Sequence, residues 1–323
     1  MKWGILGVAN ITNKLIPAFQ QSKTGKLVAI SSRSIDKAKI CSEKYNIPKY
    51  YGNYRDLIRD PEIEAVYIPL PNHLHKEWTL EAASHKKHVL CEKPLAVTSQ
   101  DAADMFYGSQ KHGCKLMEAF MYRFDPKIEK IRKMIQDKTL GEIKYIDFNF
   151  SHPLEERLAK KNDYRLNKEY GGGAFYDLGV YGINLINYLL EDTPKEILDC
   201  KVIKNDEKDI DRTTFTKLLY PNNVVATMTV SFQFYSNYLQ IAGTTGALEV
   251  SNIISQNDGE LRLKKYKVLN ISTEKLNAFN SYKAMIKHFN DCIINEKQPE
   301  ITTEQTLGTL RMVEKILERM KKI

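Results

Sequence analysis

The sequence predicts an α/β protein made of two domains: an N-terminal doubly wound parallel sheet, and a C-terminal α+β domain built on a large, mostly antiparallel open sheet. The length of 323 residues suits two domains of ordinary size. Over the first third, short apolar runs alternate with segments of helical period, a pattern typical of right-handed β-α-β units. After about residue 120, strand candidates follow one another directly, which favours antiparallel pairing.

The N-terminal domain is predicted over residues 1–120 from these alternating elements. Its first helix, for example, places Leu15, Ile16 and Phe19 at helical spacing. The expected strands are Lys2–Leu6, Leu27–Ser31, Ala65–Leu70, His88–Cys91 and Lys115–Ala119. The expected helices are Ile11–Gln21, Ile35–Tyr45, Leu74–His85 and Thr98–His112.

The C-terminal domain is predicted over residues 121–323 and begins with a helix at Asp125–Asp137. An apolar helix at Gly173–Leu190 interrupts its strands. Thr302 and Gln305 have capping-box spacing at the start of the last helix, which could pack back on the first domain. The expected strands are Ile143–Ser151, Ile197–Ile203, Thr213–Tyr220, Val224–Phe234 and Tyr238–Gly243, and the closing helices are Ala278–Asn295 and Thr302–Lys322.

Composition narrows the class of protein. The net charge is +8, but the basic residues are dispersed and accompany no nucleic-acid-binding signature. No run of about 18 apolar residues predicts a membrane span. The chain enters a strand at once, without a secretory signal, and its five cysteines form no paired framework. We therefore expect a cytoplasmic protein that binds a small molecule, with no nucleic-acid or membrane partner and no metal site, since no zinc-ligand cluster is present.

A phosphate-binding turn is indicated between the first strand and the first helix. The G-x-G-x-x-G pattern of dinucleotide folds is occupied by Gly7, Ala9 and Thr12. Alone, this is a weak match, and a plain strand-turn-helix is the alternative. The position before a helix whose first amides can hold phosphate favours a Rossmann-type site formed by Gly7, Ala9, Asn10 and Ile11.

The end of the second strand bears on cofactor choice. An NAD site usually has a carboxylate about 20 residues past the glycines, and none is present at Ser32. Arg33 follows, and a guanidinium suits a 2′-phosphate. The sequence thus favours NADP(H), with NAD(H) possible; the alternative for Arg33 is an ordinary surface residue.

Two further segments follow strands whose carboxyl ends meet at one edge of a parallel sheet, where such folds bind ligands. They are YIPLPNHLH, over 67–75, and HVLCEKPLA, over 88–96. A lysine in a partly dry pocket there could bind a substrate oxygen or tune a proton donor. The alternative for a single lysine such as Lys93 is a solvated side chain.

The combination resembles the glucose–fructose oxidoreductase / inositol dehydrogenase (Gfo/Idh/MocA) family. The matching stretches run in family order from Met1 to about Leu190, and the most specific are the E-K-P block and GGGAFYDLGVYGINL. Tyr181, where inositol dehydrogenases have His, is similar to the dihydrodiol and xylose dehydrogenase branch. The resemblance implies a cis Lys93–Pro94 peptide and a catalytic set of Lys93, Asp177 and Tyr181.

The site residues that we expect follow from these motifs together. Asp177 and Tyr181 are four residues apart and so share a helical face. The glycines at 171–173 are expected to leave the helix entrance open to a ligand. The expected substrate ligands are Lys93, Arg165, Asp177 and Tyr181. The expected cofactor ligands are Gly7, Ala9, Asn10, Ile11, Ser32, Arg33, Leu70, Pro71, Asn72, His75, Glu92, Lys93 and Arg123.

These predictions indicate an NADP(H)-dependent oxidoreductase that transfers a hydride between the nicotinamide and a carbinol or carbonyl carbon. Sugars, inositols, dihydrodiols and keto-sugars all remain open as substrates, in either direction. The alternative is a non-catalytic dinucleotide-binding sensor of the same fold, which would have no need of all three catalytic residues. An open sheet face is usually buried by another subunit, so a homodimer or a dimer of dimers is expected.

Overall fold

The computed structural model describes residues 1–154, 163–204, 208–267 and 270–322. The chain divides into two compact units. Unit 1 consists of Met1–Phe124 with Asn280–Leu307, and unit 2 consists of Asp125–Phe279 with Gly308–Ile323. The division at Phe124 lies close to the expected boundary, whereas the return of residues 280–307 to unit 1 is not evident from the sequence.

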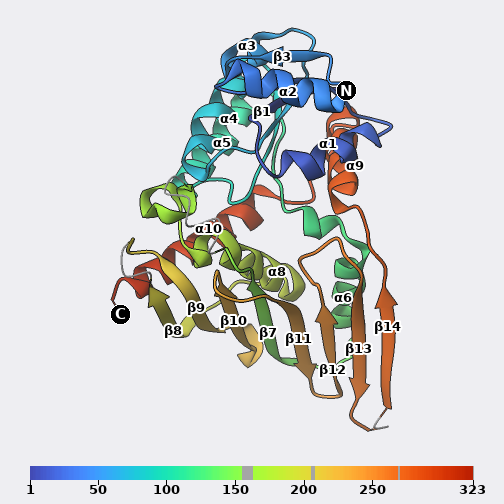
Figure 1. Cartoon of the computed structure of the whole chain (residues 1–323). Helices are drawn as coiled ribbons and strands as arrows, with labels where there is room; N and C mark the ends of the chain where they lie inside the picture. The colour runs from blue at the N-terminus through green and yellow to red at the C-terminus, as the bar shows by residue number, and fades with distance from the viewer. Residues whose placement is uncertain (155–162, 205–207, 268–269, 323) are drawn as a thin grey trace. The chain divides into compact units, whose positions relative to one another are not determined.

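Among the described residues, unit 1 contains a six-stranded sheet in the order β3-β2-β1-β4-β5-β6. Figure 1 labels β1 and β3 of this sheet, together with the helices α1 to α5. Every neighbouring pair is parallel, and the order is that of a doubly wound dinucleotide-binding sheet, which confirms the predicted fold class. The strands are β1 (Lys2–Leu6), β2 (Lys26–Ser31), β3 (Lys49–Tyr51), β4 (Ala65–Ile68), β5 (His88–Cys91) and β6 (Leu116–Glu118).

Three helices of unit 1, α2, α3 and α5, begin where a side chain caps the first amides. Ser34, Asn53 and Thr98 each accept a hydrogen bond from the backbone N–H three residues later, which satisfies a donor that the helix leaves unpaired. The helices are α1 (Thr12–Gln20), α2 (Ile35–Tyr45), α3 (Tyr54–Arg59), η1 (Asn72–Leu74), α4 (His75–Ser84), α5 (Ser99–Lys111), η2 (Met121–Phe124) and α9 (Ser281–Ile294).

The late helix α9 joins the core of unit 1 through Trp3. The Trp3 ring is fully buried and lies 5.1 Å from the ring of Phe19 and 5.8 Å from that of Phe289. Its indole N–H donates to the Asn290 side chain at 2.9 Å. A buried indole is expected to find such a partner, and this one comes from a segment 287 residues away in the chain.

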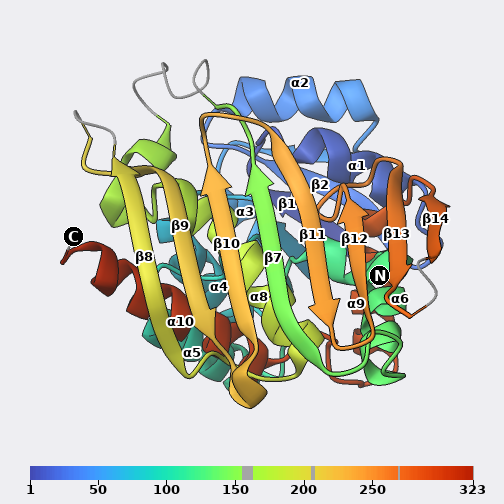
Figure 2. The same cartoon turned by 90° about the horizontal axis from the view of Figure 1, so that it is seen from below.

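Unit 2 is built on a sheet in which the described residues form eight strands, in the order β14-β13-β12-β11-β7-β10-β9-β8 (Figure 2). Only the β7–β10 pair is parallel among the described pairs, so the sheet is mostly antiparallel, as predicted. The strands are β7 (Ile143–Ser151), β8 (Glu196–Lys204), β9 (Asp211–Leu219), β10 (Val225–Ser231), β11 (Ser236–Gly243), β12 (Gly246–Ser251), β13 (Gly259–Lys265) and β14 (Asn270–Leu276).

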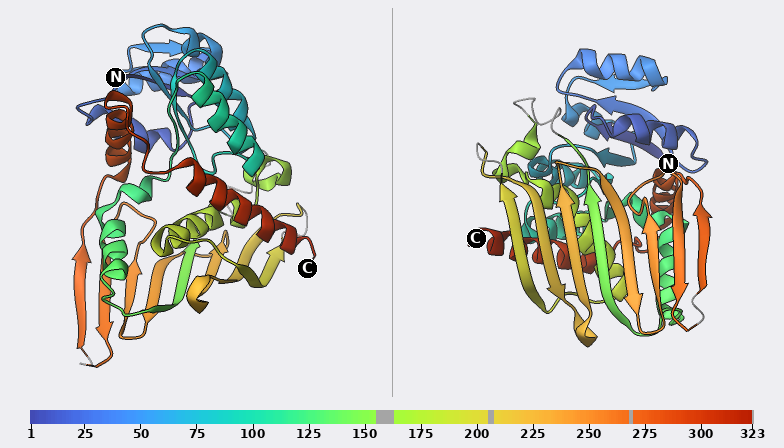
Figure 3. Two further views of the ribbon diagram at one scale, coloured as in Figure 1. Left: turned by 180° about the vertical axis from the view of Figure 1, so that it is seen from behind. Right: turned by 60° about the horizontal axis from the view of Figure 1, so that its bottom comes forward.

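Helices cover one face of this sheet (Figure 3). A side chain at Gly182 of α8 would meet Met228 and Phe148, so the missing side chain lets α8 approach the strands closely. Asn184 of α8 donates to Thr309 of α10 at 3.2 Å. The helices are α6 (Pro126–Gln136), η3 (Tyr164–Leu166), η4 (Lys168–Tyr170), a π-helical turn η5 (Phe175–Gly179), α8 (Val180–Leu190), η6 (Pro221–Asn223) and α10 (Thr303–Met320), which begins in unit 1.

Several elements differ from the prediction. The strands β12–β14 were not expected, because their solvent-facing positions are charged or polar and their apolar signal is weak. The short β3 and α3 were missed for want of length. The capping box at Thr302 and Gln305 is confirmed, since each backbone N–H donates to the other's side chain, at 3.4 and 3.3 Å.

Candidate active site

The turn after β1 has the geometry that a phosphate cradle requires. Gly7 has φ = +119°, a conformation that favours glycine, and a side chain there would come within 2.9 Å of Leu70. Its N–H donates to the Ser31 carbonyl at 2.9 Å, which fixes the turn to the end of β2. The helix α1 then begins at Thr12, and its N-cap residue Ile11 provides no side-chain hydrogen bond. Among the residues predicted to bind here, Gly7 is buried, Ala9 and Ile11 are half-buried, and Asn10 is exposed.

Thr12 shows how a larger residue fits the third glycine position. Its side chain is almost fully buried, and its hydroxyl donates to the Ala9 carbonyl at 2.5 Å. The hydroxyl is thus satisfied inside the turn, and the side chain folds away from the surface. The departure from the glycine pattern is accommodated locally.

The end of β2 places a cation near this turn. Arg33 is exposed, while Ser32 is buried and accepts from the Ser34 N–H at 3.2 Å. Burial raises the pKa of Tyr54, and the nearby Arg33 guanidinium opposes that rise. Because the Tyr54 hydroxyl lies 4.0 Å from the position of a Gly7 side chain, it joins the Arg33 region to the phosphate turn.

Residues after β4 divide between surface and interior. Pro71 is half-buried, whereas Leu70 and Asn72 are buried. His75 has no exposed surface, and its ring nitrogens lie 3.0 Å from the Pro94 carbonyl and 2.8 Å from the Leu70 carbonyl. Burial lowers the pKa of His75 to about 4, although these backbone contacts oppose the effect. His75 thus ties the loops that follow β4 and β5, and it has no surface of its own to offer a cofactor.

The loop after β5 carries the E-K-P motif. The Lys93–Pro94 peptide is cis, as the resemblance implied. Lys93 is half-buried, and Glu92 accepts a hydrogen bond from the fully buried Tyr67 hydroxyl. This loop lies at the carboxyl edge of the sheet, as does the phosphate turn, so the expected cofactor residues of unit 1 gather along one edge.

Glu118 is a buried acid that sequence reasoning did not select. It ends β6, has no exposed surface, and accepts from the Leu95 N–H at 2.9 Å and from the Thr306 hydroxyl at 2.8 Å. Burial raises its pKa to about 7, opposed by these hydrogen bonds and by Lys93. The only sequence signal was its place within the stretch MEAFMYRFDP.

Arg123, an expected cofactor or substrate ligand, is directed into unit 1. Its side chain is fully buried. Its guanidinium lies 3.4 Å from the Gln305 side-chain oxygen and 3.5 Å from a Glu300 carboxylate oxygen. These contacts join the end of the first segment of unit 1 to the returning segment, and no described contact places Arg123 among the exposed residues of the edge.

In unit 2, Asp177 and Arg165 form an ion pair. Asp177 lies in the π-helical turn η5 and is 6% exposed. The Arg165 guanidinium donates from Nε to Asp177 at 2.8 Å and from Nη1 to Asp163 at 3.2 Å, and it lies 4.5 Å from the Tyr164 ring. Although burial opposes it, the pKa of Arg165 is raised by these partners, Asp177 foremost. The pair orients Asp177, and π-turns of this kind are frequent at functional sites.

The glycines at 171–173 have a different role from the expected one. A side chain at Gly172 would lie 2.5 Å from the Arg165 carbonyl oxygen, and one at Gly173 would lie 2.0 Å from Asp211. The Gly173 N–H donates to the Arg165 carbonyl at 2.9 Å. For Gly172 and Gly173 the expectation of an opening for a ligand is wrong, because the protein's own backbone and a carboxylate occupy the space beside them.

That carboxylate holds the start of the segment that carries Asp177. Asp211 is 6% exposed and accepts from the Phe175 N–H at 2.6 Å and from the Thr214 hydroxyl at 2.7 Å. Burial raises its pKa to about 6, and these hydrogen bonds oppose the rise. A carboxylate at the start of a helix is favourably placed, because it satisfies amides that the helix leaves unpaired.

Tyr181 lies one turn beyond Asp177, on α8. It is half-buried, and its ring contacts Phe150 edge-to-face, with centroids 5.3 Å apart. Phe150 contacts His152 at 5.7 Å, and His152 contacts Tyr235 at 5.3 Å. Tyr181 therefore begins a row of aromatic rings that ends at the exposed Tyr235. Of the predicted substrate ligands, the structure brings Asp177 and Arg165 together within unit 2.

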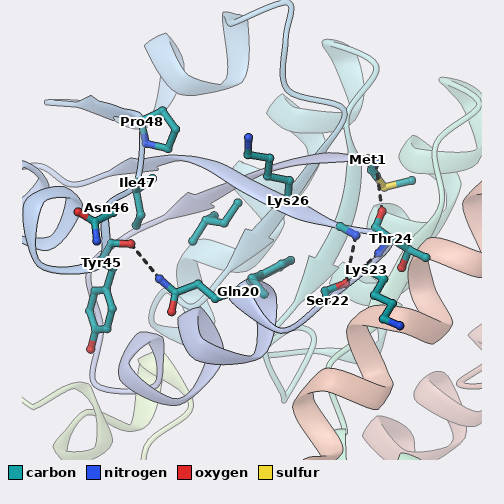
Figure 4. A pocket seen from close by; sticks show the side chains of 13 residues that line it. Met1, Gln20, Ser22, Lys23, Thr24, Lys26, Tyr45, Asn46, Ile47 and Pro48 are labelled. Atoms are coloured by element: carbon teal, nitrogen blue, oxygen red, sulfur yellow. Dashed lines mark hydrogen bonds between the residues drawn. The ribbon is translucent and has the colours of Figure 1, made fainter.

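The pocket in Figure 4 lies elsewhere in unit 1. Its volume is about 580 Å³, and Met1 and Lys26, at the amino ends of β1 and β2, help to line it. Gln20 donates to the Tyr45 carbonyl at 2.9 Å on one side of it. The phosphate turn lies at the opposite ends of the same strands, so this pocket is separate from the candidate cofactor site.

Metal-ligand clusters and membrane-spanning helices are both absent from the described ranges. In the part of the chain that the structure describes, no group of three or more His, Cys, Asp or Glu residues is placed to hold a metal ion. No helix within those ranges combines the length and apolar character needed to cross a membrane.

Two family models match the chain. Residues 1–120 match an oxidoreductase family with an NAD-binding Rossmann fold, Gfo/Idh/MocA, and residues 128–249 match a Gfo/Idh/MocA C-terminal domain. These matches cover both units and agree with the resemblance found in the sequence.

Curated relatives include enzymes of the expected branch. An uncharacterised oxidoreductase of Rhizobium meliloti is 32% identical over 98% of this chain and 96% of its own length. A D-xylose 1-dehydrogenase (NADP(+)) of Haloferax volcanii is 31% identical over 98% and 97%. A trans-1,2-dihydrobenzene-1,2-diol dehydrogenase of Xenopus laevis is 30% identical over 78% and 76%.

Solved structures give the same picture. A 3-ketoreductase from Actinomadura kijaniata, in complex with NADP and TDP-benzene, superposes with a TM-score of 0.90 at 25% identity, covering 98% of this chain and 97% of that one. An aldose–aldose oxidoreductase from Caulobacter crescentus, complexed with glycerol, superposes with a TM-score of 0.89 at 25% identity, covering 100% and 98%.

Proposed function

The chain belongs to the Gfo/Idh/MocA family of oxidoreductases, and on that premise we propose that it transfers a hydride between NADP(H) and a carbinol or carbonyl carbon of a sugar, polyol or dihydrodiol-like substrate. The observation that carries the proposal is the carboxyl edge of the parallel sheet. There a glycine turn, an exposed arginine and a half-buried lysine follow β1, β2 and β5. The family is one of oxidoreductases, and the relatives named above include two dehydrogenases, which supports an enzyme over a non-catalytic sensor.

The turn at Gly7 fits a dinucleotide. A side chain at this position would come within 2.9 Å of the Leu70 side chain, and the positive φ is a conformation that glycine adopts readily. The amides that open α1 favour a negative group, because the helix dipole is positive at its N-terminus. When bound, the nicotinamide supplies the redox chemistry, and the protein positions the reacting groups.

Arg33 supports the preference for NADP(H) over NAD(H). Its guanidinium is exposed at the end of β2, where a carboxylate would repel a 2′-phosphate. The Tyr54 hydroxyl lies near this guanidinium, whose charge lowers the Tyr54 pKa against the effect of burial. NAD(H) lacks the phosphate, so it loses this interaction and binds more weakly in the proposal.

Lys93, Asp177 and Tyr181 are the proposed catalytic residues. Tyr181 removes the proton of the substrate hydroxyl during oxidation and returns it during reduction. A phenol in water titrates near pH 10, so proton transfer at neutral pH needs a positive charge to stabilise the phenolate, and Lys93 is assigned that task. Asp177 binds a substrate hydroxyl.

Some of the expected ligands take supporting roles in this proposal. The Arg165 guanidinium donates to Asp177 and Asp163. We therefore assign Arg165 the role of orienting Asp177, in place of direct contact with the substrate. His75 and Arg123 are buried among the loops of unit 1 and support them. The cofactor contacts proposed for unit 1 are then those of Gly7, Ala9, Asn10, Ile11, Ser32, Arg33, Leu70, Pro71, Asn72, Glu92 and Lys93.

The cofactor assignment is tested by thermal unfolding with NADP⁺, NADPH, NAD⁺ and NADH in parallel. A ligand that binds only the folded state stabilises it by about 2.7 kcal/mol at 100 times its Kd. We expect a larger rise in melting temperature with the two NADP forms. A rise with the NAD forms alone would overturn the preference, and no rise with any of the four would contradict cofactor binding at this edge.

The assembly and its location are also proposed. The uncovered face of the sheet in unit 2 carries exposed apolar side chains such as Phe215, at 41%, and Ile203, at 50%. We propose that a second copy of the chain covers this face, giving a homodimer or a dimer of dimers. Light scattering of the purified protein would show a mass of one chain if the assembly is wrong.

All five cysteines are free thiols, which supports a reducing compartment such as the cytoplasm.

A further inference from the structure

Glu118 has no assigned task in the proposed mechanism, yet it lies beside the loop that carries Lys93. It ends β6, the strand next to β5, and so reaches the same carboxyl edge of the sheet. None of its surface is exposed. A carboxyl in such a place loses its hydration and needs hydrogen-bond donors in exchange, otherwise its burial costs several kcal/mol.

The two oxygens of Glu118 bind different segments. One accepts from the Leu95 N–H at 2.9 Å, two residues past Lys93. The other accepts from the Thr306 hydroxyl at 2.8 Å, in the part of α10 that belongs to unit 1. The carboxyl thus holds the Lys93 loop to α10, through a residue that lies 188 positions after Glu118 in the sequence.

The charge of the neighbourhood matters as well. Lys93 is near enough to lower the pKa of Glu118, while burial, the largest effect, and Glu92 raise it. The two acids and the lysine therefore interact as a group. Any change in the position of the loop changes the distance between the Lys93 ammonium and these carboxyls.

We propose that Glu118 is a positioning residue for Lys93: by accepting from Leu95 on one side and Thr306 on the other, it fixes the loop that presents the lysine. Its effect on catalysis rests on the proposed function of Lys93. Its effect on the order of the loop does not, and can be measured without substrate. The inference distinguishes Glu118 from a residue that merely fills the interior.

The test compares three variants with the wild type. E118A removes both acceptors, T306V removes one donor, and E118Q keeps an oxygen for Leu95 and an amide that can donate to Thr306. D60N is the matched control, because Asp60 is a buried carboxyl of unit 1 that binds Lys49 and Tyr51 near the amino end of β4.

Hydrogen–deuterium exchange over peptides spanning 88–98 reports the order of the loop. We expect exchange at least about tenfold faster in E118A, a smaller increase in T306V, and little change in E118Q or D60N. Unchanged exchange in both E118A and T306V would overturn the proposal. If E118A does not fold, T306V decides alone. It removes the hydrogen bond from Thr306 to Glu118 and leaves the Leu95 N–H with its acceptor.

Turnover and NADP⁺ affinity separate positioning from general stability. We expect kcat to fall about 10- to 100-fold in E118A, with a smaller rise in the Kd for NADP⁺, within about tenfold, because only Glu92 and Lys93 of the proposed cofactor contacts lie on this loop. E118Q should recover most of the loss. A loop that exchanges faster with kcat unchanged would overturn the positioning role. If the wild type turns over no substrate, the proposed function fails, and the exchange data still decide whether Glu118 fixes the loop.

Discussion

Two carboxyl groups hold the two segments that carry the proposed catalytic residues, one in each unit. Glu118 accepts from the Leu95 N–H on the Lys93 loop, and Asp211 accepts from the Phe175 N–H at the start of the Asp177 segment. Both are buried, both have neutral hydrogen-bond donors, and burial raises the pKa of each, to about 7 and about 6. Asp177 itself is different, because the Arg165 guanidinium binds it directly.

This difference separates the two acids that hold backbone segments, Glu118 and Asp211, from Asp177, the proposed substrate ligand. A carboxyl that meets only neutral donors titrates near neutrality and holds backbone in place. A carboxyl paired with a guanidinium keeps its charge and can bind a substrate hydroxyl. The predictions below test this distinction, from the largest expected effect to the smallest.

The largest effect is expected at the reacting groups of both units. Y181F should lower kcat by about 10²- to 10⁴-fold, because no proton donor replaces the phenol. K93M should lower kcat by a similar factor, about 10²- to 10⁴-fold. The double variant should lose little more than the worse single one, since groups that act in one step are not additive. Steady-state kinetics with NADP⁺ measures this, and losses that multiply would separate the two residues.

Removal of the guanidinium should destabilise unit 2. R165M leaves Asp177 and Asp163 without their cation, and breaking a buried ion pair costs about 3–5 kcal/mol. R165K is the matched control and should lose less, because it keeps the charge but not the planar fork. Urea unfolding measures both, and equal stability of R165M and the wild type would show that the pair does not hold Asp177.

The supporting carboxyls should show themselves in the pH dependence of stability. Their pKa values are raised in the folded state, from ordinary values of 4.5 and 3.8, so the folded protein binds protons more tightly than the unfolded chain. Each therefore contributes stability below its unfolded pKa, which is lost as the pH rises through the folded pKa. Relative to E118Q or D211N, the wild type should lose about 3 kcal/mol in each case between pH 4 and 7.

The pH measurement is a series of urea unfolding experiments on the wild type and the two variants. A stability difference that stays flat from pH 4 to 7 for both variants would show that neither carboxyl titrates as described. A wild type that gains stability relative to the variants as the pH rises would contradict the prediction, because it would mean that folding lowers the pKa of the carboxyl.

The smallest effect is expected at the cofactor's phosphate. R33A should weaken NADP⁺ binding by about 10- to 100-fold, the worth of a charge-assisted hydrogen bond or two, and leave NAD⁺ within about twofold. Y54F, which removes the hydroxyl that Arg33 reaches, should show a smaller change of the same kind. Isothermal titration with both nucleotides decides, and an equal loss for the two would remove the 2′-phosphate argument.

The fold was predictable because its signals are local. Apolar strands such as Lys2–Leu6 alternate with helices that carry their own caps, and the E-K-P and GGG motifs identify the family. The strands β12–β14 escaped prediction because one of their faces is solvated and charged. The return of α9 to unit 1 depends on Trp3 and Asn290, a contact that no local pattern encodes.

The proposed catalytic residues were predicted from sequence motifs, whereas the buried acids that hold their segments were not. Lys93, Asp177 and Tyr181 stand in motifs, whereas Glu118 and Asp211 act through partners up to 188 residues away. The glycines at 171–173 were assigned to a ligand because the sequence shows only that side chains are absent there. The structure shows what fills the space: the Arg165 carbonyl and the Asp211 carboxylate.

The central claim is hydride transfer with NADP(H), and its most direct test is NADPH formation from NADP⁺ over a panel of sugars, inositols, polyols and trans-dihydrodiols. The account predicts that at least one of these classes gives stoichiometric NADPH with the wild type, that NAD⁺ serves less well, and that Y181F loses the reaction while it still binds NADP⁺. Tight NADP⁺ binding without turnover of any class, in either direction, would contradict it.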